Sequence, residues 1–210
     1  MATIICHRGY WIDGADPNSR GAFEQGFGRG FGVETDVRDH CGELVISHDP
    51  PRGEQVGLDE LLCAYAEHGS PGPLALNVKA DGLGAMLAEA LAERGVEDWF
   101  AFDMSVPDCA AYARDGLPYF TRHSEYEATP SLYEQSAGVW IDLFESEWLD
   151  QATLDAHLEA GKRVCVVSPE LHRRDPEPAW RAWSSWPAFA SDRVSVCSDR
   201  PEELRELLPR

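Results

Sequence analysis

The stretch LALNVKADGLGAMLAEALAERG, residues 74–95, contains one complete strand–helix unit. Its first part, Leu74–Val78, is a short apolar run, which predicts a buried strand. Its second part, Leu83–Arg94, predicts a helix, because apolar residues recur on one face and Gly95 follows as a C-terminal stop. The residues of that face are Leu83, Met86, Leu87, Ala90 and Leu91. A strand followed by an amphipathic helix is the repeating element of α/β proteins.

The same unit recurs on both sides of this stretch. Seven further β-rich runs predict strands at Thr3–Cys6, Gly32–Val37, Trp99–Asp103, Tyr119–Ser124, Val139–Phe144, Arg163–Ser168 and Val194–Ser198. Segments that favour helices lie between them, at Ser19–Gly28, Leu58–His68, Pro107–Ala113, Pro130–Ser136, Leu149–Ala160, Glu177–Trp186 and Pro201–Leu208, with Asp199 expected to cap the last. A turn at Asp39–Glu43 and a strand at Leu44–Ser47 predict a short hairpin after the second strand.

Eight such units without a linker or a sequence repeat predict one domain spanning residues 1–210. The predicted fold class is α/β, as a single compact (β/α)8 TIM barrel with a short β-hairpin after strand 2. Such barrels have about 250 residues, and about 200 at the low end, so this one would be trimmed. The alternative is an open doubly wound sheet, but no Gly-x-Gly-x-x-Gly motif follows the first strand.

The composition limits the classes of partner. Thirty-seven acidic residues against 18 Lys and Arg give a formal net charge of −19, which argues against binding to nucleic acid or to anionic lipid. The apolar stretches are shorter than the roughly 20 residues of a membrane helix, and the N-terminus has no signal-peptide pattern. The six cysteines show no Cys-x-x-Cys spacing and are interpreted as reduced thiols. We therefore expect a cytoplasmic protein without a nucleic-acid partner or stable membrane association; the oligomeric state stays open.

Polar residues follow nearly every predicted strand. In a parallel barrel the C-terminal ends of the strands meet on one rim, where active sites lie. The residues expected there are His7, Arg8, Glu34, Asp36, Arg38, His48, Asp49, Asn77, Lys79, Asp103, Arg122, Ser124, Asp142, Ser168, Glu170 and Asp199. A barrel core does not require ionisable side chains at these positions, so their convergence predicts a site.

The residue types on this rim limit the chemistry. Glu34 and Asp36 are two positions apart in one strand and face the same way, as oxygen ligands of Mg²⁺ or Ca²⁺ would. His7 and His48 follow different strands and can act as general acid and base, because histidine titrates near neutral pH. An arginine and a lysine beside them can neutralise a phosphate. A metal, an acid–base pair and a cationic clamp together indicate phosphodiester cleavage.

Structural interpretations of the same residues stay open. His7 can be a strand-end histidine bonded to the backbone, and the two carboxylates can pair with Arg8 and Arg38. Lys79 is one of only two lysines beside sixteen arginines, which favours a selected point charge over chance. Trp11 follows the first strand and is expected to border the ligand. Histidines without an evident partner are interpreted as surface or packing residues: His40, His68, His123, His157 and His172.

Five short motifs together resemble the glycerophosphodiester phosphodiesterase family, which belongs to a wider group of phospholipase-C-like phosphodiesterases. They are His7-Arg8-Gly9, Pro17-Asn18-Ser19, Val33-Glu34-Thr35-Asp36-Val37, Ile46-Ser47-His48-Asp49 and Cys197-Ser198-Asp199-Arg200-Pro201. The resemblance implies a (β/α)8 barrel that hydrolyses a glycerophosphodiester to glycerol 3-phosphate and an alcohol. Relatives in the wider group release a cyclic phosphate instead.

The resemblance also implies roles for single residues. These are His7 and His48 as the catalytic pair, Arg8 as a phosphate contact, Lys79 as an electrostatic stabiliser, and Glu34 and Asp36 as ligands of a divalent metal. The family has an acidic third ligand two residues before the lysine, where this chain has Asn77. Asn77 can coordinate through its carbonyl oxygen but brings no charge, so we expect weaker metal binding.

The predicted function is a metal-dependent phosphodiesterase that hydrolyses a small glycerophosphodiester-like substrate, with Mg²⁺ or Ca²⁺ as cofactor. Arg122 and Asp142 lie across the barrel from the first two strands and are expected to contact the leaving alcohol. One alternative is a catalytically weak or inactive barrel that binds a phosphorylated metabolite, for which Asn77 is the reason. The other is a lyase that forms a cyclic phosphate.

Overall fold

The computed structural model describes residues 1–208 of the chain. Its strands are β1 (Thr3–His7), β2 (Gly32–His40), β3 (Glu43–Ile46), β4 (Val56–Gly57), β5 (Leu74–Val78), β6 (Trp99–Phe102), β7 (Phe120–His123), β8 (Gly138–Ile141), β9 (Arg163–Val167) and β10 (Val194–Ser198). Its α-helices are α1 (Arg20–Gly28), α2 (Leu58–Glu67), α3 (Gly84–Glu93), α4 (Val106–Asp115), α5 (Gln151–Glu159), α6 (Glu177–Trp183) and α7 (Pro201–Leu207). Three 3-10 turns are η1 (Tyr133–Gln135), η2 (Pro169–His172) and η3 (Pro187–Ala190). Over the described residues this confirms the predicted α/β class.

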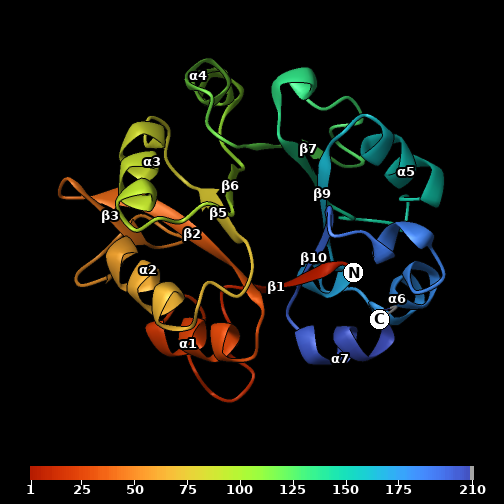
Figure 1. The fold of residues 1–210 in the computed structure, drawn as a ribbon, viewed down its shortest axis with the longest axis horizontal. Coiled ribbons are helices and arrows are strands. Elements are labelled where there is room, and N and C mark those ends of the chain that lie inside the picture. The colour runs from red at the N-terminus through yellow and green to blue at the C-terminus, as the bar shows by residue number, and fades with distance from the viewer. Residues whose placement is uncertain (209–210) are drawn as a thin grey trace.

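Eight of the strands run parallel and form the frame of the molecule, with the helices arranged around them (Figure 1). Hydrogen-bonded pairing follows the order β6-β5-β2-β1-β10-β9-β8-β7. In the part of the chain that the structure describes, β6 and β7 are joined by one parallel bridge, Ala101 to Tyr119, and the Ala101 amide donates to Pro118 O at 3.0 Å. β3 and β4 add an antiparallel hairpin beside β2, so the sheet is mixed. None of the helices in residues 1–208 has both the length and the apolar character needed to cross a membrane.

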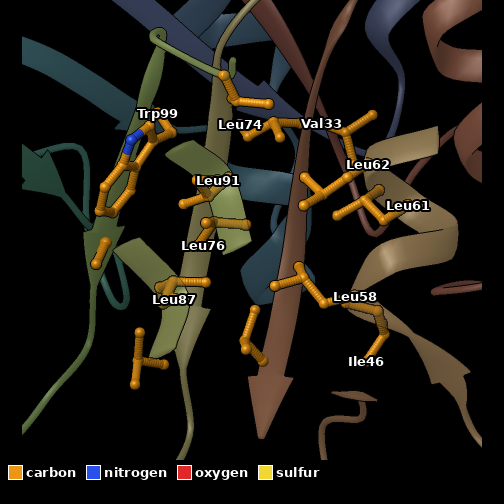
Figure 2. Packing of buried hydrophobic residues seen from close by; sticks show 14 of the residues in the cluster. Val33, Ile46, Leu58, Leu61, Leu62, Leu74, Leu76, Leu87, Leu91 and Trp99 are labelled. Atoms are coloured by element: carbon orange, nitrogen blue, oxygen red, sulfur yellow. The ribbon is translucent and has the colours of Figure 1, made fainter. Parts of the chain in front are cut away.

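The helices bury their apolar faces against the strands. Figure 2 shows Leu61 and Leu62 of α2 near Val33 of β2, and Leu87 and Leu91 of α3 beside β5. All five side chains belong to residues that are at most 1% exposed. Truncating such a leucine to alanine costs roughly 2–5 kcal/mol, so this packing fixes the positions of β2 and β5 firmly. Both strands carry predicted site residues.

A separate apolar cluster lies on the face of the sheet turned away from the helices. Aromatic rings dominate this cluster at β6 and β7, the two strands that share a single backbone bridge. Phe100 of β6 stacks on Phe120 of β7 with ring centroids 3.7 Å apart, and Phe102 stacks on Trp140 of β8 at 3.8 Å. Such pairs add about 0.5–1.5 kcal/mol beyond their area burial. Side-chain packing therefore links β6 to β7 and β8 where the backbone provides a single bridge.

Three local features differ from the sequence predictions. Pro130–Ser136 is not an α-helix but contains the short turn η1, because Leu132 has a φ of 51° that interrupts a right-handed helix. Asp199 does not cap α7: its side chain binds His7, and Arg200 occupies the N-cap position without a side-chain capping hydrogen bond. The strand β4 is not predicted, since two residues carry no alternation of polar and apolar side chains.

Candidate functional site

A sharp turn after β1 places His7 at the ends of the parallel strands. Arg8 and Gly9 both have positive φ, of 57° and 82°. At position 9 a Cβ atom would lie 2.7 Å from the main chain of Ala22 in α1, so only glycine fits between the turn and the helix. His7 Nδ1 lies 2.8 Å from Asp199 Oδ1, beyond the end of β10. The alternative prediction, in which His7 bonds to the backbone, is wrong, because its Nδ1 pairs with a carboxylate.

Opposing effects set the pKa of His7. Burial lowers it, whereas the hydrogen bond with Asp199 and the charge of Glu34, whose Oε2 is 3.9 Å from Nε2, raise it, and the net shift is upward. Glu34 is 2% exposed, and burial raises its pKa to about 6 against the opposing charge of His7 and with added repulsion from Asp36. The Arg8 amide donates to the same Glu34 oxygen at 3.2 Å. Two groups with perturbed pKa values therefore lie side by side, as is typical of functional sites.

Asp36 is a fully buried carboxylate surrounded by donors. Its Oδ2 accepts from Asn18 Nδ2 at 2.8 Å and lies 3.1 Å from Arg8 Nε. Its Oδ1 has Lys79 Nζ at an ion-pair distance of 3.4 Å. Asn18 is fixed in turn by the Thr35 hydroxyl, which donates to Asn18 Oδ1 at 2.8 Å. Arg8 and Lys79 are thus held in place by one carboxylate.

Oxygen atoms suited to a metal ion converge beside Asp36. Asn77 of β5 pairs in register with Asp36, and Oδ1 of each is buried without a hydrogen-bond partner. Glu34 lies two residues before Asp36 on the same face of β2. Within residues 1–208, Asp36 Oδ1 has only the ion-pair contact with Lys79, and Asn77 Oδ1 has no donor; such buried oxygens favour a cation, and Mg²⁺ and Ca²⁺ take carboxylate and amide oxygens. Across residues 1–208 no three His, Cys, Asp or Glu side chains are grouped for a metal, so the donor set fits a divalent ion only if Asn77 supplies the third oxygen.

His48 follows the β2–β3 hairpin, just after the end of β3. The Ser47 amide donates to the Asp36 carbonyl oxygen at 3.0 Å, so the chain that leaves β3 returns to the level of Asp36. His48 follows with its side chain half exposed, and its Nδ1 lies 2.9 Å from Asp49 Oδ1. Among the contacts of residues 1–208, no hydrogen bond or ion pair joins His48 to His7. The two histidines therefore have separate carboxylate partners.

On the other side of the strand ends, a second set of charged residues pairs within itself. Arg122 of β7 forms an ion pair with Asp103, and its Nε lies 3.0 Å from Asp142 Oδ2. The other Asp142 oxygen is 3.1 Å from His172 Nε2. Asp103, with a φ of 70°, also lies 3.9 Å from Lys79 Nζ. Lys79 and Asp103 thereby connect the two sets of charges.

These contacts place the predicted residues in two groups. The strand half of the site consists of His7, Arg8, Glu34, Asp36, Asn77 and Lys79, and the loop half consists of Asp103, Arg122, Asp142 and His172. His172 is interpreted from sequence as a residue without a partner, which is wrong, because the turn η2 that carries it to Asp142 leaves no sequence pattern. Asn18 is not predicted as a site residue, although the motif Pro17-Asn18-Ser19 was the available signal.

Two contacts near the site bear on further predictions. Arg38 donates to the His48 carbonyl oxygen at 3.1 Å, so of the two arginines expected to pair with β2 carboxylates, Arg8 does so. The Trp11 indole donates to the His7 carbonyl oxygen at 3.0 Å, which keeps this ring on the first loop. Both contacts are to main-chain oxygens next to the predicted catalytic side chains.

His123 and His157 are interpreted from sequence as surface or packing residues without partners, but both have partners. His123 Nδ1 lies 3.0 Å from His157 Nε2, and the Tyr133 hydroxyl lies 2.9 Å from the other ring nitrogen of His157. Burial lowers the pKa of His123, and burial together with the charge of His123 lowers the pKa of His157 to about 4. This cluster joins β7, η1 and α5 and is a packing group.

Three solved structures share this fold over nearly the whole chain. A protein assigned as a glycerophosphodiester phosphodiesterase in Galdieria sulphuraria has a TM-score of 0.77 and 19% identity, covering 98% of this chain and 97% of that one. The glycerophosphodiester phosphodiesterase from Agrobacterium tumefaciens has a TM-score of 0.67 and 17% identity, covering 98% and 100%. A phosphodiesterase from Oleispira antarctica, in complex with the product sn-glycerol-3-phosphate, has a TM-score of 0.70 and 16% identity, covering 99% and 96%. No protein-family model and no curated protein matches the sequence. The likeness is therefore one of fold.

Proposed function

We propose that this chain is a metal-dependent phosphodiesterase that hydrolyses a small glycerophosphodiester-like substrate, with its eight parallel strands acting as a closed (β/α)8 barrel. The observation that carries the proposal is the strand half of the site, where His7 lies beside the buried carboxylate of Glu34, and Arg8 and Lys79 lie against the buried carboxylate of Asp36. This set stands at the strand ends of a fold shared with three phosphodiesterases, one of which holds sn-glycerol-3-phosphate. Acid–base groups, acidic ligands and cations in one place suit phosphodiester cleavage.

Arg8 and Lys79 would bind the phosphate group. Asp36 fixes both side chains, with its oxygens 3.1 Å from Arg8 Nε and 3.4 Å from Lys79 Nζ. A guanidinium or ammonium group that binds one carboxylate still has N–H groups for a second anion. Glu34, Asp36 and Asn77 would hold the divalent cation, which neutralises charge on phosphoryl oxygens when bound. Two charged ligands neutralise less of the cation's charge than three would, so more positive charge remains beside the substrate.

His7 and His48 would move the protons. Asp199 holds Nδ1 of His7, which leaves Nε2 to face the reacting group, and Asp49 holds Nδ1 of His48 in the same way. One imidazole takes the proton of the attacking hydroxyl, and the other gives a proton to the leaving oxygen. Arg122 and Asp142 of the loop half would contact the leaving alcohol, because they lie across the strand ends from β1 and β2.

The test is turnover by the purified chain. Bis-p-nitrophenyl phosphate and glycerophosphocholine would be incubated with Mg²⁺, Ca²⁺ or Mn²⁺, each with and without chelator, and products followed by phosphorus NMR. Metal-dependent release of glycerol 3-phosphate is the expected result. A cyclic phosphate product would change the reaction to that of a lyase. No turnover of a wider diester panel with any metal would overturn the proposal.

A phosphate-binding protein without turnover is the second candidate. It is favoured by one observation, the neutralisation of Asp36 by Arg8 and Lys79 beside an uncharged Asn77. Calorimetry with glycerol 3-phosphate separates the two candidates, because tight binding together with no diester hydrolysis supports the binding protein.

A further inference from the structure

The turn η2 carries a partly exposed carboxylate, Glu170, that bonds to the end of β10. Glu170 Oε1 accepts from the Ser198 hydroxyl at 2.5 Å and from the Asp199 amide at 3.2 Å. Its Oε2 accepts from the Ser168 hydroxyl. Ser168 and Ser198 are both fully buried. A carboxylate with donors on both oxygens makes charge-assisted hydrogen bonds, which are stronger than those of a neutral acceptor.

The support under Glu170 is rigid. The Trp180 indole of α6 is 1% exposed and donates to the Ser168 hydroxyl at 2.7 Å. Pro169 begins η2 and is buried, which fixes φ at the residue before Glu170. Contacts from α6 and from the turn η2 therefore hold the Glu170 side chain in place against β10.

Asp199 connects this support to His7. Its amide donates to Glu170, while its carboxylate receives Nδ1 of His7 at 2.8 Å. Among the contacts of residues 1–208, Glu170 is the acceptor that holds the Asp199 amide, since α7 begins at Pro201 and takes no side-chain cap from Asp199. The amide nitrogen and the side chain of Asp199 are attached to the same Cα atom, so fixing the amide restricts where the side-chain carboxylate can lie.

We infer that Glu170 is a positioning residue for the reaction: it holds the Asp199 main chain so that the Asp199 carboxylate keeps His7 Nε2 directed at the substrate. This inference rests on the proposed function and adds to it a residue of the η2 turn. Glu170 contacts no reacting atom, and its effect passes through Asp199. A displacement of about 1 Å at such a supporting position can cost about 100-fold in rate without a loss of binding.

The first test is steady-state kinetics of two substitutions. Glu170→Ala is expected to lower kcat by about 10- to 100-fold and leave KM within about twofold. Glu170→Gln is expected to restore most of kcat, because the amide oxygen can accept from Asp199 and Ser198 while its NH2 group donates to Ser168. The matched control is Glu177→Ala on α6, which removes the same charge from an exposed pair with Arg181 and leaves kcat unchanged.

A second test separates positioning from stability. Asp199→Asn and the double variant with Glu170→Ala are expected to have nearly equal kcat, because the two residues act through one imidazole. Glu170→Asp keeps the charge but shortens the side chain, and the same loss of kcat is expected. This variant replaces Glu170→Ala in the test if the alanine variant does not fold. Proton NMR provides a further readout: the downfield resonance expected from the His7 Nδ1 proton should be lost in Asp199→Asn and weakened in Glu170→Ala.

The outcomes distinguish this inference from the proposed function. Wild-type kcat in folded Glu170→Ala or Glu170→Asp, beside an inactive His7→Ala, overturns the role of Glu170 alone. Additive losses in the double variant overturn it as well, because Glu170 would then act elsewhere. Full activity in His7→Ala overturns the proposed function instead.

Discussion

The strand half and the loop half of the site are built on different supports. His7, Glu34, Asp36 and Asn77 lie within strands β1, β2 and β5, whose parallel pairing is continuous, and the last three are at most 9% exposed. In the loop half, Asp103 and Asp142 follow the ends of β6 and β8, and His172 lies on the turn η2. Side chains fixed by a hydrogen-bonded ladder keep their mutual distances, whereas side chains on turns adjust more readily. Under the proposed function, this difference would suit the strand half to bond cleavage and the loop half to recognition of the alcohol.

The largest expected effect is on the histidines. His7→Ala and His48→Ala should each lower turnover by at least about 100-fold with the fold intact, and the double variant should be little worse, because an acid–base pair acts as a unit. Turnover with the preferred diester and circular dichroism measure the two properties. His40→Ala, in the hairpin turn, is the matched control. Near-normal turnover in either folded single variant would remove this mechanism.

Metal affinity tests whether Asn77 of the strand half is a metal ligand. Asn77→Glu adds a third ligand charge, so it should tighten divalent-metal binding in the absence of substrate by about tenfold. Calorimetry of the substrate-free protein measures this directly. The opposite result, unchanged affinity in a folded variant, would place the third ligand elsewhere, with Asp103 as the next candidate. Turnover can change in either direction, since a more neutralised cation polarises phosphate less.

Substrate choice tests the loop half. Arg122→Ala should raise KM several-fold for the preferred substrate and change the order of preference within a diester panel, with little change in kcat. Arg114→Ala, an exposed arginine of α4 paired with Asp115, is the control. A uniform loss of kcat at constant KM would move Arg122 into the group that acts on the phosphate and would erase the distinction between the halves.

The smallest expected effect is on the pH dependence of folding stability, through the buried histidine His157. Because burial holds the pKa of His157 near 4 in the folded state, against about 6.5 unfolded, the unfolded chain binds this proton first as pH falls. The contribution is fully present above about pH 6.5 and is lost between that pH and about pH 4. Thermal unfolding should show a drop of a few degrees over this range that is reduced in His157→Gln. An equal pH dependence in both proteins would show that His157 is not held neutral by the fold.

The sequence predicts the repeating elements better than their contacts. The eight parallel strands lie within a few residues of the predicted runs, because each is a short apolar segment bounded by turn residues. The residues of the strand half could be named because their spacing of two along β2 and β5 survives folding unchanged. Asp199 as a partner of His7, His172 as a partner of Asp142 and Glu170 as a support of Asp199 could not, because each contact joins segments about 30 or more residues apart through turns. The catalytic roles, the metal and the cytoplasmic location stay predictions.

The junction of β6 and β7 has the sparsest backbone pairing among the parallel strands, so we expect local opening there first. With one backbone bridge, its amides should exchange with deuterium through local opening, at a lower free energy than those of β1 and β10. Asp103 follows β6 and Arg122 lies on β7, so this motion separates their ion pair first, while the ladder of β1, β2 and β5 stays closed. Under the proposed function, such an opening would widen the mouth of the site for alcohols of different size and leave the distances within the strand half unchanged.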